Sequence, residues 1–301
     1  MAEIEESLNK PVFLNFESGF AEITFFGPVL LLFFLMIFNP VVMAQQLPDR
    51  LVFERILSEN VRIEKGLSQN TVNTMIQDSE GFMWFGTWDG LNRYDGYNFL
   101  IYNKSNGLSN ETIRALFQRN DTLWVGTEYG LNILQMSTGE ISNFYHDEQD
   151  STSLSSNVIN HIFEDHLGVI WISTDAGLSA FRPASGGFSR VISRDYGNPL
   201  RSNNMNMATQ DSLDNYWIAT SYGLVLYEIE NRSVTRFFHI SGDSSSLPDN
   251  HVNSLAFDQS GRLWVGTRAG LCQYIPESRN FITIDYHGQL KPEITTIHVD
   301  G

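Results

Sequence analysis

The stretch WFGTWDGL, from Trp84 to Leu91, decides the fold because its skeleton occurs five times in the chain. In every copy a Trp is followed at fixed distances by a small residue, a Thr, a Gly and a Leu. The copies begin at Trp84, Trp124, Trp171, Trp217 and Trp264. They are 40, 47, 46 and 47 residues apart, and a nearly fixed period of this length is typical of repeat architectures.

Each period has room for four short strands. In the first period the apolar runs with alternating character are VNTMIQD from Val72, FMWFGT from Phe82, LNRYD from Leu91 and NFLIY from Asn98. The sequence therefore predicts an all-β fold, a β-propeller of four-stranded blades. In this fold we expect the constant Trp and Leu to be packing residues, and the small residue two places after Trp to leave room for the adjoining blade.

Two turns punctuate each predicted blade. The sequence Asp78-Ser-Glu-Gly81 favours a type I turn between the first two strands, because Asp and Gly suit its first and last positions. The segment Thr87 to Gly90 is expected to form the next hairpin, with the Gly at positive φ. Blade two shortens the first turn, and blade four has Asp214 where the others have Gly.

A second motif, similar to Leu-Ser-x-Asn, precedes each Trp by 16 or 17 residues. Its leucines are Leu67, Leu108, Leu154, Leu200 and Leu247. The same frame places Leu290 before a sixth blade, whose first strand would be ITTIHVDG, residues 294–301. We therefore expect residues 67–301 to form five blades plus the first strand of a sixth. Because propellers avoid free edges by closing, this incomplete ring predicts a fragment of a longer polypeptide.

The N-terminal segment, residues 1–44, is predicted to be a signal peptide or signal anchor. VLLLFFLMIF, residues 29–38, is short for a membrane span, and Val42 and Ala44 precede a suitable cleavage position. The acidic residues before this run depart from the usual basic pattern. Residues 45–66 are expected to be a lead-in whose stretch 50–56 supplies a ring-closing outer strand.

Composition excludes some partners. The net charge of −16 repels phosphate backbones, so no nucleic-acid partner is expected for this chain. A single cysteine, Cys272, allows no intrachain disulfide. The seven histidines lack metal-ligand spacing. We accordingly expect no metal and no cofactor.

The two variable residues inside each Thr-x-x-Gly turn are the candidate ligand-binding residues. In a four-stranded meander this hairpin and the connection entering the blade emerge on the same side, so these residues share one rim. Aromatic rings can stack on sugars, and charged groups can bond hydroxyls in a fork. The candidates are Trp88, Asp89, Glu128, Tyr129, Asp175, Tyr222 and Arg268, while Ala176, Ser221 and Ala269 complete the positions.

The sequence allows two alternatives to ligand sensing, an enzyme and a protein-binding scaffold. The Asp-x-x-Gly-x-x-Trp pattern is similar to the aspartate boxes of sialidase-type propellers, and acidic rim residues could form a glycosidase pair. A propeller lyase would need a base such as His161 or His251. The aspartate pattern is a structural turn with different spacing, however, and we expect no catalytic residue. A scaffold that binds an envelope protein stays open.

The segment from Gly66 to Phe99 resembles the first repeat of the two-component regulator propeller family, and the resemblance extends over about residues 50–301. It implies a periplasmic sensor region of a Bacteroidetes hybrid histidine kinase that detects oligosaccharides and regulates polysaccharide-utilisation genes. It also implies an inner-membrane-attached, dimeric parent with kinase modules. This sequence shows no phosphoacceptor or ATP-binding motif, so the chain itself is not expected to be an enzyme.

Overall fold

The structure, a computed structural model, describes residues 66–183, 187–193, 204–228, 230, 233–286 and 291–299. The predicted signal segment, residues 1–44, and the predicted ring-closing strand, residues 50–56, lie outside the described residues, as do Leu200 and Leu290. Within the described ranges no helix is long and apolar enough to cross a bilayer.

Five four-stranded antiparallel sheets follow one another along the chain, and in each the spatial order of strands is the chain order. Blade one has β1 (Val72–Gln77), β2 (Met83–Thr87), β3 (Gly90–Tyr94) and β4 (Phe99–Tyr102); blade two has β5 (Ile113–Arg119), β6 (Thr122–Thr127), β7 (Gly130–Gln135) and β8 (Ile141–Phe144); blade three has β9 (Ile159–Glu164), β10 (Ile170–Thr174), β11 (Gly177–Arg182) and β12 (Gly187–Ser193); blade four has β13 (Met205–Gln210), β14 (Tyr216–Thr220), β15 (Gly223–Glu228) and β16 (Ser233–Phe237); blade five has β17 (Val252–Phe257), β18 (Leu263–Thr267), β19 (Gly270–Ile275) and β20 (Asn280–Thr283). The prediction of an all-β propeller is confirmed.

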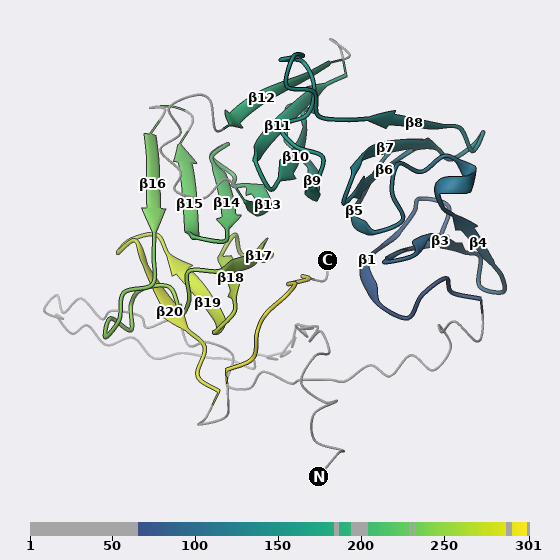
Figure 1. Ribbon diagram of the computed structural model, residues 1–301. Helices are drawn as coiled ribbons and strands as arrows, with labels where there is room; N and C mark the ends of the chain where they lie inside the picture. Colours follow the sequence, from purple (N-terminus) through teal and green to yellow (C-terminus); the bar gives the residue numbers. More distant parts are fainter. Residues whose placement is uncertain are drawn as a thin grey trace, which may run out of the picture.

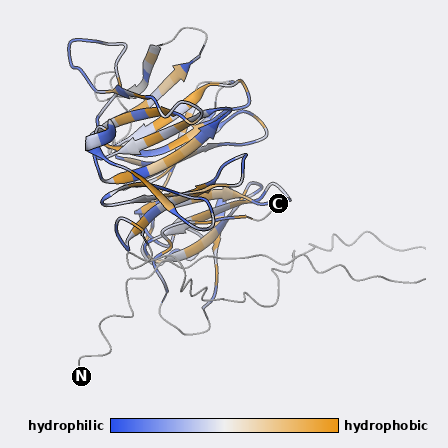
Figure 2. Cartoon of the chain, turned by 90° about the vertical axis from the view of Figure 1, so that its right-hand side faces the viewer, coloured by the Kyte–Doolittle hydropathy of each residue, from blue (hydrophilic) through white to orange (hydrophobic). Residues whose placement is uncertain are grey.

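The blades are arranged around a common centre, with the first strand of each blade innermost (Figure 1). Apolar residues lie along the strands, and the connections between them are mainly hydrophilic (Figure 2). A short 3₁₀ turn, η3 (Lys104–Asn106), lies between blades one and two. Because the strands of each blade follow chain order, the hairpin between its second and third strands lies on the same side of the ring as the connection that enters the blade.

The constant residues pack between blades as predicted. Trp84 and Leu91 of blade one are fully buried in one cluster with Ile113 and Val125 of blade two. Gly86 leaves room for this contact, because a Cβ added there would lie 2.6 Å from Ile113 Cγ2. Gly126 makes the same close approach to Ile159 of blade three. The small residue after each Trp thus sets how closely the next inner strand can approach.

The turn aspartates have a further role that the packing interpretation missed. Asp78 accepts the backbone N–H groups of Glu80 and Phe82 with Oδ1, and its Oδ2 accepts the indole Nε1–H of Trp84 at 2.7 Å. The same indole bond recurs from Trp171, Trp217 and Trp264 to Asp165, Asp211 and Asp258. Blade two has no such aspartate, and the buried Nε1 of Trp124 has no partner there.

Positive φ values occur where the turn chemistry predicts them. Gly81 has φ 92° in the type I turn, and Gly90 has φ 107° in the hairpin that follows. Blades without the first glycine use residues that tolerate this region, namely Asn120 with φ 50° and Asp214 with φ 64°. The local backbone geometry is therefore kept even where the sequence motif changes.

The last described segment, residues 291–299, occupies the inner position after blade five but forms no strand. It runs toward the middle of the ring in Figure 1. Ile294 and Ile297 are buried against blade five, and Asn253 donates to the backbone oxygen of Ile294 at 2.9 Å. The predicted sixth-blade segment therefore lies in the expected place. It lacks the ladder of hydrogen bonds that would make it a strand.

Candidate functional site

The inner strands are linked from blade to blade by a repeated asparagine. Asn73, the second residue of β1, donates its side-chain amide to the backbone oxygen of Ile113 in blade two. Equivalent bonds run from Asn160 to Met205, from Asn206 to Val252 and from Asn253 to Ile294, at distances of 2.6 to 2.9 Å. We call this set of contacts the asparagine ladder.

Blade two interrupts the asparagine ladder with Arg114. Its longer side chain reaches across to blade three, where Nε and Nη2 both donate to Asn160 Oδ1 at 3.1 and 2.9 Å. Its Nη1 lies 3.3 Å from Glu128 Oε1 on the rim hairpin of its own blade. A bond from a side chain to the backbone is thus replaced by a charged network that faces solvent.

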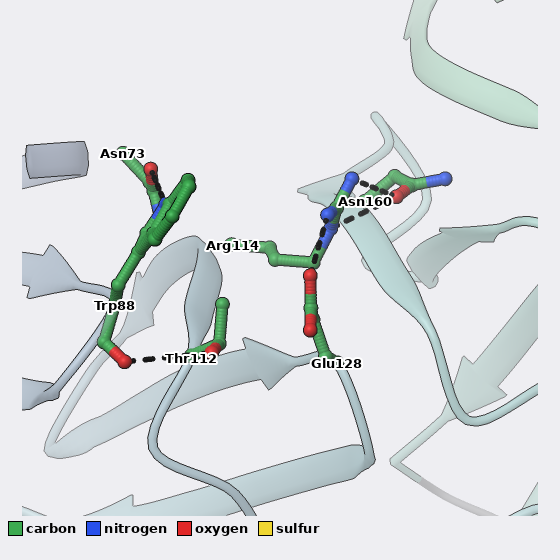
Figure 3. Close-up of a pocket in the computed structure, with 6 residues that line it drawn as sticks. All are labelled: Asn73, Trp88, Thr112, Arg114, Glu128 and Asn160. Atoms are coloured by element: carbon green, nitrogen blue, oxygen red, sulfur yellow. Dashed lines mark hydrogen bonds and ion pairs between the residues drawn. The ribbon is translucent and has the colours of Figure 1, made fainter. Parts of the chain in front are cut away.

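This interruption coincides with an open pocket of about 340 Å³ on the rim. Figure 3 shows the two sides of the pocket, with Trp88 and Asn73 on one side and Arg114, Glu128 and Asn160 on the other. The indole Nε1 of Trp88 donates to Asn73 Oδ1 at 2.9 Å, which fixes the ring's orientation while most of it stays exposed. The pocket therefore combines an aromatic face with a fork of polar groups, contributed by three blades.

The rim hairpin of blade one is held by hydrogen bonds to the segment that enters the blade. Ser68 donates its backbone N–H to Asn92 at 2.9 Å, and its hydroxyl lies 3.0 Å from that of Thr87. Thr87 in turn donates to the Gly90 carbonyl and accepts from the N–H of Asp89. The recurring Leu-Ser-x-Asn and Thr-x-x-Gly motifs are thus parts of one support, which confirms that they share a rim.

All seven predicted ligand-binding residues are exposed at the hairpin tips, but only two of them line the pocket. These two, Trp88 and Glu128, are the first variable residues of their turns, and each contacts the inner strand of its own blade. Arg268, also a first variable residue, pairs at 3.7 Å with Glu293 of the last segment. First variable residues with a side-chain contact thus face inward.

The two tyrosines at second variable positions point the other way. Tyr129 packs against Tyr145 with ring centroids 5.8 Å apart, and Tyr222 packs edge-on against Phe238 at 5.5 Å. Both partners follow the outer strands of their blades. Asp89 and Asp175 are exposed and do not line the pocket. The pocket therefore does not bring Asp89, Tyr129, Asp175, Tyr222 or Arg268 to the site that holds Trp88 and Glu128.

Four pocket residues were missed by sequence reasoning: Asn73, Thr112, Arg114 and Asn160. Three of them occupy the second position of an inner strand. Aligning the blades on their tryptophans, with a gap for the shortened turn of blade two, gives Asn, Arg, Asn, Asn and Asn at this position. The single Arg was therefore a visible departure from the repeat, and it marked the site.

The two histidines that a lyase reading would use, His161 and His251, both have lowered pKa values. His161 on β9 has its Nδ1 buried without a partner, and burial lowers the pKa of the ring to about 4. The pKa of His251 also lies below its ordinary value, because of burial and the nearby Arg268. Within the described part of the chain, no three His, Cys, Asp or Glu side chains gather as a metal site would require.

Four segments of the chain match the family model described as the two component regulator propeller: residues 66–89, 107–129, 153–176 and 246–269. These segments cover blades one, two, three and five, from the Leu-Ser-x-Asn motif to the rim hairpin. These four segments match the repeat of that family, and the suggested resemblance is confirmed.

Known proteins agree with this result. Histidine kinase P4 of Formosa agariphila is 30% identical over 195 residues, which are 58% of this chain and 14% of the relative. The extracellular domain of a putative hybrid two component system from B. thetaiotaomicron has a TM-score of 0.67 at 27% identity, covering 73% of this chain and 31% of that one. A second extracellular domain from the same organism, from a putative one component system, has a TM-score of 0.52 at 23% identity, covering 76% and 36%.

The chain thus spans about a seventh of the curated relative and about a third of each similar structure. Its fold and repeats are those of a propeller sensor domain of the kind found in the extracellular domains of hybrid two component systems.

Proposed function

We propose that this propeller is the periplasmic, ligand-sensing part of a hybrid two-component histidine kinase, and that it detects an oligosaccharide in the rim pocket. The observation that carries the proposal is the pocket itself. An exposed indole and a fork of Arg, Glu and Asn face the same space, at the one described inner-strand position where Arg interrupts the asparagine ladder.

The chemistry of the pocket suits a sugar ring. The apolar face of a pyranose stacks on an aromatic ring, and its hydroxyls both donate and accept hydrogen bonds. Trp88 offers the stacking surface, while Glu128 and Asn160 present oxygens on the opposite side of the pocket. A volume of about 340 Å³ lies at the lower end of the range for ligand pockets, so the pocket holds one or two residues of a chain that continues across the rim.

Signalling would require the remainder of the receptor, including membrane and kinase modules and a second copy of the receptor. A ligand shifts a receptor only if it binds two arrangements with different affinity. The pocket is built from blades one, two and three, so its shape depends on how these blades sit against one another. In this proposal the output is control of genes for polysaccharide utilisation, and catalysis by the propeller has no part.

Tryptophan fluorescence tests the proposal at a single position. All six tryptophans of the chain lie among the described residues; five are 0–6% exposed, whereas Trp88 is 61% exposed. A sugar stacked on Trp88 should therefore shift the emission of that residue alone. The probes are hexasaccharides of glucose, xylose, mannose, arabinose and galacturonic acid at millimolar concentration.

We expect at least one hexasaccharide to give a saturable shift that is absent in Trp88→Phe, while calorimetry still detects binding to this variant. Trp171→Phe serves as the matched control and should keep the emission change. If no probe alters the emission of the wild-type protein, or if the shift persists in Trp88→Phe, the rim pocket is not the sensing site.

A further inference from the structure

We infer that the rim pocket selects uncharged sugar residues and discriminates against uronic acids and sulfated sugars. This inference rests on the proposed function and specifies which oligosaccharides the site accepts. An arginine in a sugar pocket ordinarily indicates an acidic ligand, but the contacts of Arg114 point in the opposite direction.

The positive charge of Arg114 is already matched within the protein. Its Nε and Nη2 atoms donate to Asn160 Oδ1, and its Nη1 atom donates to Glu128 Oε1. Each guanidinium nitrogen makes one of these bonds, so each Nη atom keeps one further N–H. A carboxylate that bonds this guanidinium would lie beside the negative charge of Glu128.

Other donors of the pocket are bonded within the protein. Asn160 gives its amide to Met205 O at 2.9 Å, so its oxygen is the atom turned toward Arg114. Asn73 gives its amide to Ile113 O, and the indole N–H of Trp88 is bonded to Asn73. The pocket offers a ligand an aromatic face and the carboxylate of Glu128 as an acceptor, and its remaining guanidinium N–H groups lie next to that carboxylate. A hydroxyl can donate to such acceptors, whereas a carboxylate or a sulfate only accepts.

Charge around the pocket reinforces this selection. Glu128 is the first variable residue of its hairpin, and the chain carries a net charge of −16. The repulsion of Glu128 for a negative group offsets the attraction of the paired Arg114. For a group held about 5 Å away in a water-exposed site, this repulsion corresponds to on the order of tenfold in affinity. Glu128 is therefore the specificity-determining residue of this pocket, because it keeps Arg114 neutralised.

The test compares xylohexaose and arabinohexaose with hexagalacturonate, using the wild-type protein and two charge-matched variants. Glu128→Gln releases Arg114 from its ion pair and removes the negative charge at the pocket. Asp175→Asn makes the same change of charge at the equivalent hairpin position of blade three, outside the pocket. Affinities are measured by calorimetry at low and high salt, because an anionic ligand alone should show a salt dependence.

We expect the wild-type protein to bind a neutral hexasaccharide at least about tenfold more tightly than hexagalacturonate. Glu128→Gln should shift this ratio about tenfold toward hexagalacturonate, and Asp175→Asn should shift it less than threefold. If hexagalacturonate binds the wild type as tightly as the neutral sugars, the inference is wrong and the proposed function stands. Equal shifts in both variants also overturn the inference, because the effect would then be general. Absence of binding by every sugar contradicts the proposed function itself.

Discussion

The replacement Asp165→Ala should destabilise the protein more than the same change at the turn aspartate of blade one. Asp165 is buried, and its Oδ1 accepts the N–H groups of Leu167 and Val169 at 2.9 Å. Its Oδ2 accepts the indole of Trp171 at 2.7 Å and the hydroxyl of Tyr216, from the next blade, at 2.8 Å. This carboxylate therefore links a turn, its own blade and its neighbour.

The magnitude follows from the donors that would be left without acceptors. A buried donor that loses its partner costs about 1–3 kcal/mol. Asp165→Ala leaves two such donors, on Trp171 and Tyr216, so we expect a loss of about 4 kcal/mol in the free energy of unfolding. Asp78→Ala leaves one such side-chain donor, the indole of Trp84, so about 2 kcal/mol is expected there.

Urea denaturation followed by circular dichroism measures both losses. The variant Tyr216→Phe and the double variant with Asp165→Ala separate the bond between blades from the bonds within blade three. The coupling between the two sites should be about 1–2 kcal/mol. If Asp165→Ala costs no more than Asp78→Ala, or if the coupling is near zero, the carboxylate does not join the blades in the way described.

Three further outcomes are expected. Gly86→Ala should cost about 1–3 kcal/mol in urea denaturation, because its Cβ would lie 2.6 Å from Ile113, and a variant that matches the wild type would contradict the packing argument. His161 has a pKa of about 4 in the folded protein, below its unfolded value, so stability should fall as pH drops from about 6.5 to 4, by at most about 3 kcal/mol. His161→Met, which copies Met207 of blade four, should flatten that part of the stability profile, and an unchanged profile would show that His161 is not the group responsible. Trp88→Ala should change stability by less than about 0.5 kcal/mol because the ring is exposed, yet abolish the sugar-dependent emission change; a large loss of stability would place the indole in the core.

The architecture was predictable because the repeat restates the same physical requirements five times. The Trp, the small residue and the Thr-x-x-Gly turn fix the second and third strands of a blade and its distance from the next blade. The indole bond to the turn aspartate was not predicted, although both residues recur in register. Packing alone accounts for a constant Trp, so the repeat does not by itself assign a partner to the indole Nε1.

The candidate site was predictable only to the level of the rim. Whether a hairpin residue faces inward or outward depends on the twist through the turn, and this direction separates Glu128 from its neighbour Tyr129. The sequence pattern carries no record of that direction. Arg114 was different, because its column in the blade alignment shows the departure from Asn without any structure. The signal for the site therefore lies at a nearly constant inner-strand position and not at the variable turn positions.

The most direct test of the central claim is a calorimetric titration of the wild-type protein and Arg114→Asn with the hexasaccharide that shifts the emission of Trp88. The replacement introduces the residue that the other described blades carry at this position, so it should restore the asparagine ladder and leave the urea midpoint unchanged or higher. We predict that the affinity falls at least about tenfold because the polar fork is gone. Equal affinity in the two proteins would contradict the claim that the interruption of the ladder creates the ligand site.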